Sequence, residues 1–132
     1  MIAVDCTVLA DWLFNSGPLR ESAIRLQTLE PNWSCLALAR YELGNVAWKL
    51  ARAGRIAVED VALGWVALAA AEIEIEHQVD WPEVSALAQV REISFYDASH
   101  VWFAMSRGIP LYSRDGPLRA KCPDVVRAMP VG

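Results

Sequence analysis

Short apolar runs alternate along the chain with longer segments in which apolar residues recur at helical spacing. This alternation is typical of parallel βαβ units. Strands are expected at residues 2–5, 33–35, 73–76, 110–113 and 125–129. Helices are expected at residues 8–13, 20–29, 36–53, 58–71, 82–90 and 94–107. The order predicts an α/β fold, a three-layer α/β/α sandwich with a mostly parallel central sheet.

Local signals refine these elements. Residues 73–76 alternate apolar and acidic side chains, as a strand near a sheet edge does. Helical phase places most of the six tryptophans in the core, notably Trp48, Trp65 and Trp102. Gly54 and Gly108 are expected to end the helices that precede them.

The composition indicates one folded domain over residues 1–132. With 55% hydrophobic and 21% charged residues, the chain lies far from the composition of disordered proteins. We expect neither a secretory signal nor a membrane span, because the richest apolar run, residues 61–71, is interrupted by Gly64. Three cysteines without C-x-x-C spacing favour reduced thiols and a cytoplasmic location.

A net charge of -4 is unfavourable for a protein that binds nucleic acid, since Lys and Arg supply most of the affinity for phosphates. Four carboxylates gathered around a divalent metal would account for all of this negative excess. The net charge therefore neither supports nor excludes binding of nucleic acid.

Four acidic residues each have a structural explanation when taken singly. Asp5 closes the first strand and suits a helix N-cap. Asp97 completes Ser94-Phe95-Tyr96-Asp97, the pattern of a capping box. Glu42 lies on the polar face of a helix, and Asp115 precedes Gly116-Pro117, where a turn is expected.

Taken together, the acids indicate chemistry. Asp5 and Asp115 follow strands, and the carboxyl ends of parallel strands form the edge at which ligands bind in such folds. Clustered carboxylates raise one another's pKa, so their grouping is unfavourable unless a cation lies among them. Oxygen ligands favour Mg²⁺ or Mn²⁺. The sequence predicts a site for one or two such ions.

The same segments carry a family resemblance. The sequence resembles PIN-domain endoribonucleases of the VapC toxin type along essentially its whole length, through the segments Val4-Asp5-Cys6-Thr7-Val8-Leu9, Tyr41-Glu42-Leu43-Gly44-Asn45-Val46, Ser94-Phe95-Tyr96-Asp97-Ala98 and Leu111-Tyr112-Ser113-Arg114-Asp115. The resemblance implies a metal-dependent ribonuclease that uses Asp5, Glu42, Asp97 and Asp115 as catalytic and metal-binding acids. It further implies that Thr7, Asn45 and Ser113 are polar supports that orient the acids.

Some positions depart from the family pattern. Ser113 stands where threonine is usual, Cys6 where a smaller residue is common, and Glu92 where a glycine often precedes the third motif. None of these departures removes a carboxylate.

The implied reaction is hydrolysis of an RNA phosphodiester by a metal-activated water, which requires no histidine base. His77 and His100 are therefore assigned to ordinary packing. The candidates for RNA contact are basic residues near the last acid and on the Glu42 helix: Arg114, Arg119, Lys121, Lys49 and Arg52.

Partners follow from the resemblance as well. Toxins of this family are held by an antitoxin segment in an apolar groove, and Trp12 and Phe14 on the first short helix are candidates for such a groove. We expect a cognate antitoxin and a homodimer, and no membrane association.

Two other functions stay open from the residues alone. A protein-binding module with the same fold could have lost metal affinity, which measured divalent-metal binding would reveal. A phosphate-handling α/β hydrolase of the haloacid-dehalogenase type is disfavoured, because its second aspartate would fall at Thr7.

Overall fold

The computed structural model describes residues 1–131 and has a five-stranded sheet in the order β3-β2-β1-β4-β5, with every neighbouring pair parallel. The strands are β1 (Ile2–Val4), β2 (Trp33–Leu36), β3 (Glu74–Glu76), β4 (Leu111–Tyr112) and β5 (Val126–Arg127). The helices are α1 (Cys6–Leu13), α2 (Pro18–Leu29), α3 (Ala37–Arg52), α4 (Val58–Ala70), α5 (Trp81–Arg91), α6 (Phe95–Arg107) and α7 (Gly116–Lys121).

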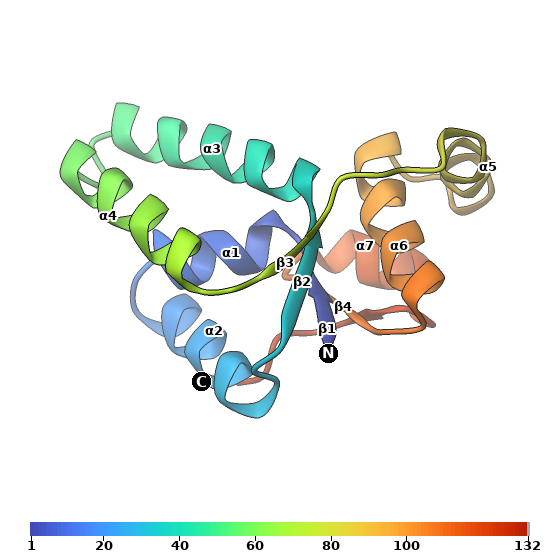
Figure 1. Ribbon diagram of the computed structural model, residues 1–132, viewed down its shortest axis with the longest axis horizontal. Coiled ribbons are helices and arrows are strands. Elements are labelled where there is room, and N and C mark those ends of the chain that lie inside the picture. The colour runs from blue at the N-terminus through green and yellow to red at the C-terminus, as the bar shows by residue number, and fades with distance from the viewer. Residues whose placement is uncertain (132) are drawn as a thin grey trace.

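Helices cover both faces of the sheet (Figure 1). Helices α1 to α4 pack on one side, around a core that includes Val8, Leu9 and Leu43. Helices α5, α6 and α7 lie on the other side, where the core includes Val101 and Phe103. The predicted three-layer α/β/α sandwich with a parallel sheet is confirmed.

The central strand β1 explains why the sheet is covered on both sides. Ile2, Ala3 and Val4 are at most 1% exposed, so both faces of β1 need apolar cover. Ala3 pairs with Ser34 of β2 on one side and with Leu111 of β4 on the other. Strands β2 and β4 therefore deliver the residues that follow them to the carboxyl end of β1.

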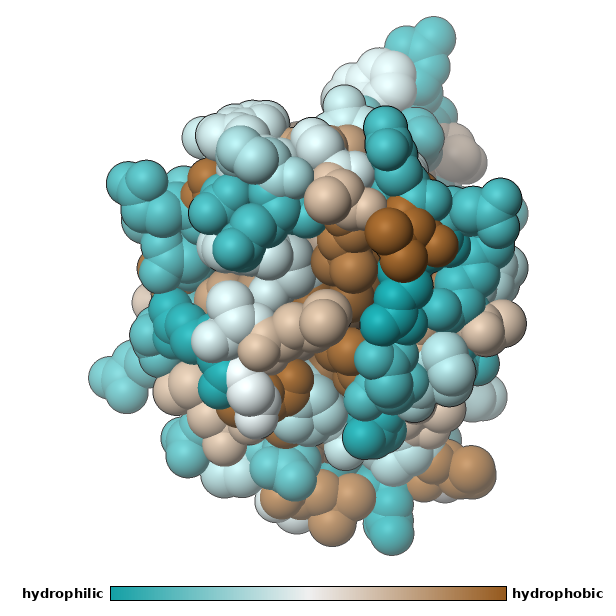
Figure 2. Space-filling model, turned by 90° about the vertical axis from the view of Figure 1, so that its right-hand side faces the viewer, coloured by the Kyte–Doolittle hydropathy of each residue, from teal (hydrophilic) through white to brown (hydrophobic). Residues whose placement is uncertain are grey.

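The side formed by α5 and α6 faces the viewer in Figure 2, where a strip of hydrophobic side chains lies in a hollow between hydrophilic ones. A hollow between these two helices is lined by Leu87, Trp102 and Met105. Next to it, Trp81 stacks on Phe95 with ring centroids 5.2 Å apart.

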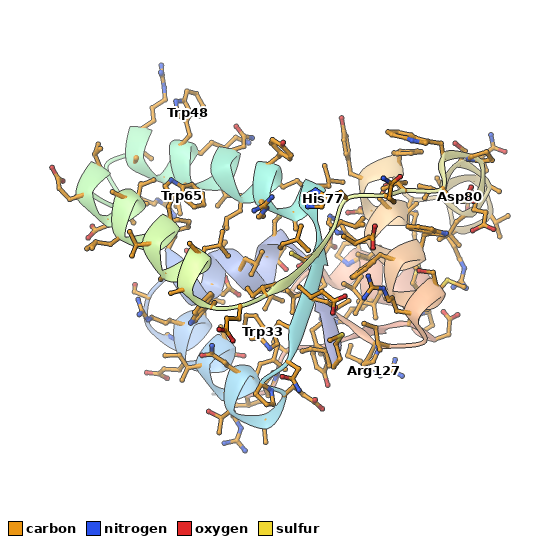
Figure 3. All side chains as sticks on the ribbon, in the orientation of Figure 1. Trp33, Trp48, Trp65, His77, Asp80 and Arg127 are labelled. Carbon is orange, nitrogen blue, oxygen red and sulfur yellow. The ribbon has the colours of Figure 1, made fainter. Side chains whose placement is uncertain are left out.

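Two predictions about tryptophan were wrong. Trp48 is 56% exposed and Trp65 is 36% exposed; Figure 3 shows Trp48 pointing away from the protein. Helical phase identifies the face of α3 that carries Trp48 but not how far α4 extends to cover it. Arg52 lies over the Trp48 ring, 5.4 Å from its centroid, and shields part of it.

Helix α7 was missed by the sequence analysis, which expected only a turn after Asp115. Asp115 is the N-cap of this helix, and its side chain accepts a hydrogen bond of 3.1 Å from Leu118 N. Pro117 occupies the first turn, where its missing N–H costs nothing. The last strand is also shorter than expected, Val126–Arg127.

Two backbone positions, Glu92 and Gly64, are relevant to the stability predictions made in the Discussion. Glu92, after α5, has φ 56°, the left-handed region in which glycine is at ease. Gly64 of α4 faces Phe14, and a Cβ at Gly64 would lie 2.6 Å from Cζ of that ring.

Within residues 1–131, no helix combines the length and apolar character that crossing a membrane would need.

Candidate metal-binding active site

Asp5 lies at the carboxyl end of β1 and caps helix α1. Its Oδ1 accepts hydrogen bonds from Thr7 N (3.0 Å), Thr7 Oγ1 (2.5 Å) and Val8 N (3.4 Å), and its Oδ2 accepts one from Ser113 Oγ (2.5 Å). Asp5 is 6% exposed. Donors from two elements thus fix the orientation of this buried carboxylate.

Thr7 and Ser113 also tie the loop after β4 to the start of α1. The Thr7 hydroxyl accepts a hydrogen bond from Arg114 N (3.0 Å), and the Ser113 hydroxyl accepts one from Asp115 N (3.1 Å). Both hydroxyls donate to Asp5, so each links the Asp5 carboxylate to the backbone of the loop. The position of Asp115 relative to Asp5 is therefore fixed by hydrogen bonds.

Glu42, in the second turn of α3, is held from the opposite side of the sheet. His100 of α6 is 3% exposed, and its Nε2 lies 2.6 Å from Glu42 Oε1. Burial lowers the pKa of His100, but the hydrogen bond and charge of Glu42, together with Asp5 and Asp97, outweigh it and raise the pKa above its ordinary value. His100 Nδ1 is buried without a partner within residues 1–131.

Asp97 lies in the first turn of α6, three residues after the N-cap Ser94, whose hydroxyl accepts from Asp97 N at 3.0 Å. Burial raises the pKa of Asp97, and the charges of Asp115 and Asp5 raise it further. His100 and Ser94 act in the opposite direction without cancelling these effects. Asp97 is thus close enough to two other acids to feel their charge.

The pKa of the Cys6 thiol indicates that Glu42 lies near the other acids. Burial raises the pKa of Cys6 to about 12, and the negative charges of Glu42, Asp5 and Asp97 add to that increase. Interactions of this kind act over short distances in a protein. Asp5, Glu42, Asp97 and Asp115 therefore gather at one edge of the sheet, from β1, α3, α6 and the start of α7.

The donor set fits a hard divalent cation. All four groups are carboxylates, and the pKa of Asp97 shows mutual repulsion that a bound cation would relieve. Within the described part of the chain, no group of three or more His, Cys, Asp or Glu side chains is arranged so that it could hold a metal ion as the side chains stand. Mg²⁺ keeps several waters and is held through one or two carboxylates, so it does not require three protein ligands.

Of the polar supports expected from sequence, Thr7 and Ser113 contact Asp5 directly. Asn45 is exposed on α3, and its side chain makes no hydrogen bond within residues 1–131. It lies one helical turn from Glu42, on the same face of α3.

The basic residues expected to contact RNA divide into two groups. Arg114 and Arg119 flank Asp115, and Arg119 Nη1 donates to Ser113 O at 3.0 Å. Lys121 donates to Glu92 O at 2.5 Å at the end of α7. Lys49 and Arg52 lie in the last turn of α3, about 10–15 Å from Glu42 along the helix axis at 1.5 Å per residue.

Two residues at the site were missed by sequence analysis. His100 was assigned to packing but contacts Glu42, 58 residues away in the chain. Asp11 was not singled out, yet it is 1% exposed and pairs with Arg114. A signal for Asp11 does exist in the sequence, because Thr7 and Asp11 are four residues apart on an otherwise apolar helix, and Asn15, two residues beyond its end, continues the spacing.

Comparison with known proteins supports the fold. No family model matches the chain. A protein of Pyrobaculum aerophilum named Exonuclease VapC9 is 34% identical over 92 residues, which are 65% of this chain and 64% of that protein. The match thus spans somewhat less than two thirds of the relative's length.

Two solved structures share the fold. The crystal structure of PAE2754 from Pyrobaculum aerophilum has a TM-score of 0.76 and 26% identity, with 95% of this chain and 81% of that chain covered. The structure of Mycobacterium tuberculosis VapC20, described as a sarcin-ricin loop cleaving toxin, has a TM-score of 0.72 and 21% identity, with 98% and 100% covered. The class that this likeness defines is an α/β/α domain with a parallel central sheet.

Within that class, the relative and the neighbours point to one group. The chain is similar to VapC-type proteins in sequence over 92 residues and in fold over nearly its whole length. The resemblance inferred from the four sequence segments is confirmed.

Proposed function

We propose that residues 1–132 form one nuclease domain, a metal-dependent endoribonuclease that serves as the toxin of a toxin–antitoxin pair. The observation that carries the proposal is the gathering of Asp5, Glu42, Asp97 and Asp115 at the carboxyl edge of the sheet, where burial, and then the charges of Asp115 and Asp5, raise the pKa of Asp97. Four like charges are costly there unless the site takes up a cation.

The four acids would hold Mg²⁺ or Mn²⁺, as one or two ions. When bound, such an ion activates the attacking water and neutralises charge on the phosphoryl oxygens. Asp5 is oriented by Thr7 and Ser113, and Glu42 is oriented by His100, so each is fixed before an ion arrives. Preorganised ligands of this kind lose little freedom when they bind.

RNA is the proposed substrate, because cationic groups lie next to the acids despite the net charge of -4. Arg114 and Arg119 stand on either side of Asp115 and can contact phosphates on the two sides of a scissile bond. Lys121, Lys49 and Arg52 lie farther out and can contact more distant phosphates.

An antitoxin segment is the proposed partner of a groove between α1 and α4. The groove has a volume of about 530 Å³ and is lined by apolar and polar side chains, among them Trp12, Leu63, Arg20 and Asp60. This mixture suits an amphipathic segment laid across it. A homodimer is proposed through the apolar side formed by α5 and α6 (Figure 2), where Trp81 is 65% exposed.

The cytoplasm is the proposed location, because Cys6, Cys35 and Cys122 are all free thiols.

The test is an RNase assay of the purified protein with Mg²⁺ or Mn²⁺ and with EDTA. Cleavage that requires the metal supports the proposal, and cleavage that persists in EDTA contradicts the metal-dependent reaction. A covalently closed circular RNA separates the two modes of cleavage, because only an endonuclease can open it. Metal binding without any cleavage would favour a protein-binding module.

A further inference from the structure

Asp11 is a buried carboxylate that the proposed chemistry does not use. It lies in α1, is 1% exposed, and has both oxygens paired: Oδ2 accepts from Arg114 Nε at 2.7 Å, and Oδ1 accepts from Asn15 Nδ2 at 2.7 Å. A buried carboxylate is strongly unfavourable without such partners. It also lies one helical turn from Thr7, so it adds negative charge beside a site that is already acidic.

Only one nitrogen of the Arg114 guanidinium group, Nε, has a partner within the described residues. Its backbone N–H is bound by Thr7 and its Nε by Asp11, while its side chain is 45% exposed. Nη1 and Nη2 donate to no acceptor within the described residues, so these two guanidinium nitrogens are available to a ligand. The Arg114 charge reaches the site, since it opposes the effect of the acids on the Cys6 thiol.

We propose that Asp11 is a positioning residue for substrate binding: by holding Nε of Arg114, it fixes the guanidinium so that Nη1 and Nη2 bind a phosphate of the RNA next to the one that is cleaved. The proposal rests on the proposed ribonuclease function. A planar guanidinium held through Nε presents its other two nitrogens as a fork that matches two phosphate oxygens.

A purely structural role for the Asp11–Arg114 pair predicts the opposite direction of change in RNA binding. If Asp11 only stabilised the fold, Asp11→Asn would remove a negative charge near the RNA and leave binding unchanged or tighter. If Asp11 positions Arg114, the same substitution weakens binding although it makes the protein less negative. The direction of the change therefore separates the two roles.

The experiment measures binding of a fluorescein-labelled 20-nucleotide stem-loop RNA by anisotropy in Ca²⁺, at several salt concentrations, for folded proteins verified by thermal melts. Asp11→Asn is expected to weaken binding roughly three- to tenfold, and Arg114→Gln roughly tenfold with a salt slope reduced by about one. The matched control is Glu74→Gln, which removes one charge and a 2.7 Å pair with Arg107 at the far end of α6 from Asp97. It is expected to bind as wild type or slightly tighter.

Coupling between the two residues gives a second readout. The double variant Asp11→Asn/Arg114→Gln is expected to bind no more than about twofold worse than Arg114→Gln alone, because Asp11 acts only through Arg114. Additive losses would overturn the proposal, as would unchanged or tighter binding by Asp11→Asn. If Asp11→Asn does not fold, Arg114→Lys replaces it, because lysine keeps the charge without the fork; binding equal to wild type would then refute the inference.

Cleavage in Mg²⁺, measured separately, tests the proposed function. Wild type that binds the RNA but cleaves none would refute the nuclease function, while the Asp11 comparison would still decide this inference. Wild type that does not bind RNA at all would refute both.

Discussion

Replacing Asp97 by asparagine tests the metal site most directly, because a capping role and a metal-binding role predict opposite results. Asparagine keeps the size of the side chain and removes its charge. Burial and the charges of Asp115 and Asp5 raise the pKa of Asp97, so the folded protein disfavours its ionised form. An acid whose pKa is raised on folding lowers stability above that pKa, and its neutral replacement removes this penalty at pH 7.

The expected magnitudes follow from the position of Asp97 at the N-terminus of α6. Losing a charge there costs about 0.3–1 kcal/mol through the helix dipole, whereas relief of burial and repulsion acts in the other direction. We therefore expect Asp97→Asn in EDTA to be as stable as wild type or slightly more stable. Mg²⁺ at about ten times its Kd should stabilise wild type by about 1.4 kcal/mol, roughly 3–5 °C in Tm. A tenfold weaker site in the variant should reduce this gain to about 0.4 kcal/mol.

The assay combines thermal melts, with and without Mg²⁺ or Mn²⁺, and RNA cleavage at saturating metal. Cleavage by Asp97→Asn is expected to fall by two or more orders of magnitude. Asp80→Asn is the matched control, because Asp80 caps α5 by accepting from Glu83 N at 3.0 Å and lies outside the acidic group. It should keep both the metal-dependent shift and the activity. A destabilised Asp97→Asn protein that cleaves RNA at nearly the wild-type rate would show that Asp97 is only a helix-capping residue.

Further predictions concern the fold. Glu92→Gly should raise the free energy of unfolding by about 0.5–1 kcal/mol in urea titrations, because relief of the left-handed strain exceeds the entropy gained by the unfolded chain; an unchanged midpoint would argue against strain. Gly64→Ala should lower it by about 1–3 kcal/mol, because the added methyl overlaps the Phe14 ring, and a variant as stable as wild type would refute that contact. Arg91 holds the pKa of Asp124 below its ordinary 3.8, so their pair stabilises the fold above that pH and is lost below it. In acid melts the wild type should therefore lose more stability than Asp124→Asn, and parallel curves would count against the pair.

The sheet could be predicted because its strands are short apolar runs whose burial needs no knowledge of distant partners. The start of α7 could not be separated from a turn, since Asp115-Gly116-Pro117 suits both and the helix is only six residues long. The exposure of Trp48 depends on whether another element packs against that face of α3, a tertiary property that helical phase does not contain. Local signals thus determined elements, and contacts between helices determined what they bury.

The candidate site shows the same contrast between what local sequence signals predict and what contacts between distant residues determine. The four acids were predicted from the resemblance, and two of them, Asp5 and Asp115, also from their positions after strands. The contacts of His100 and Asp11 could not be predicted, because their partners are 58 and 103 residues away in the chain. A buried histidine and a buried aspartate in a helix each look like packing until the opposite element is known. Residues that orient acids are selected by three-dimensional contacts, and for that reason sequence patterns reveal them poorly.

A capping position does not exclude metal binding by these acids, because one carboxylate can accept backbone hydrogen bonds and still offer oxygen lone pairs to a cation. Asp5 and Asp115 are N-caps of α1 and α7, and Asp97 lies in the first turn of α6, so three helix N-termini meet at the candidate site. Backbone N–H donors and the positive ends of these helices stabilise the carboxylates one at a time. They cannot remove the repulsion among the acids, which the raised pKa of Asp97 still reports. The fold therefore holds like charges together without a cation, at a cost that cation binding would relieve.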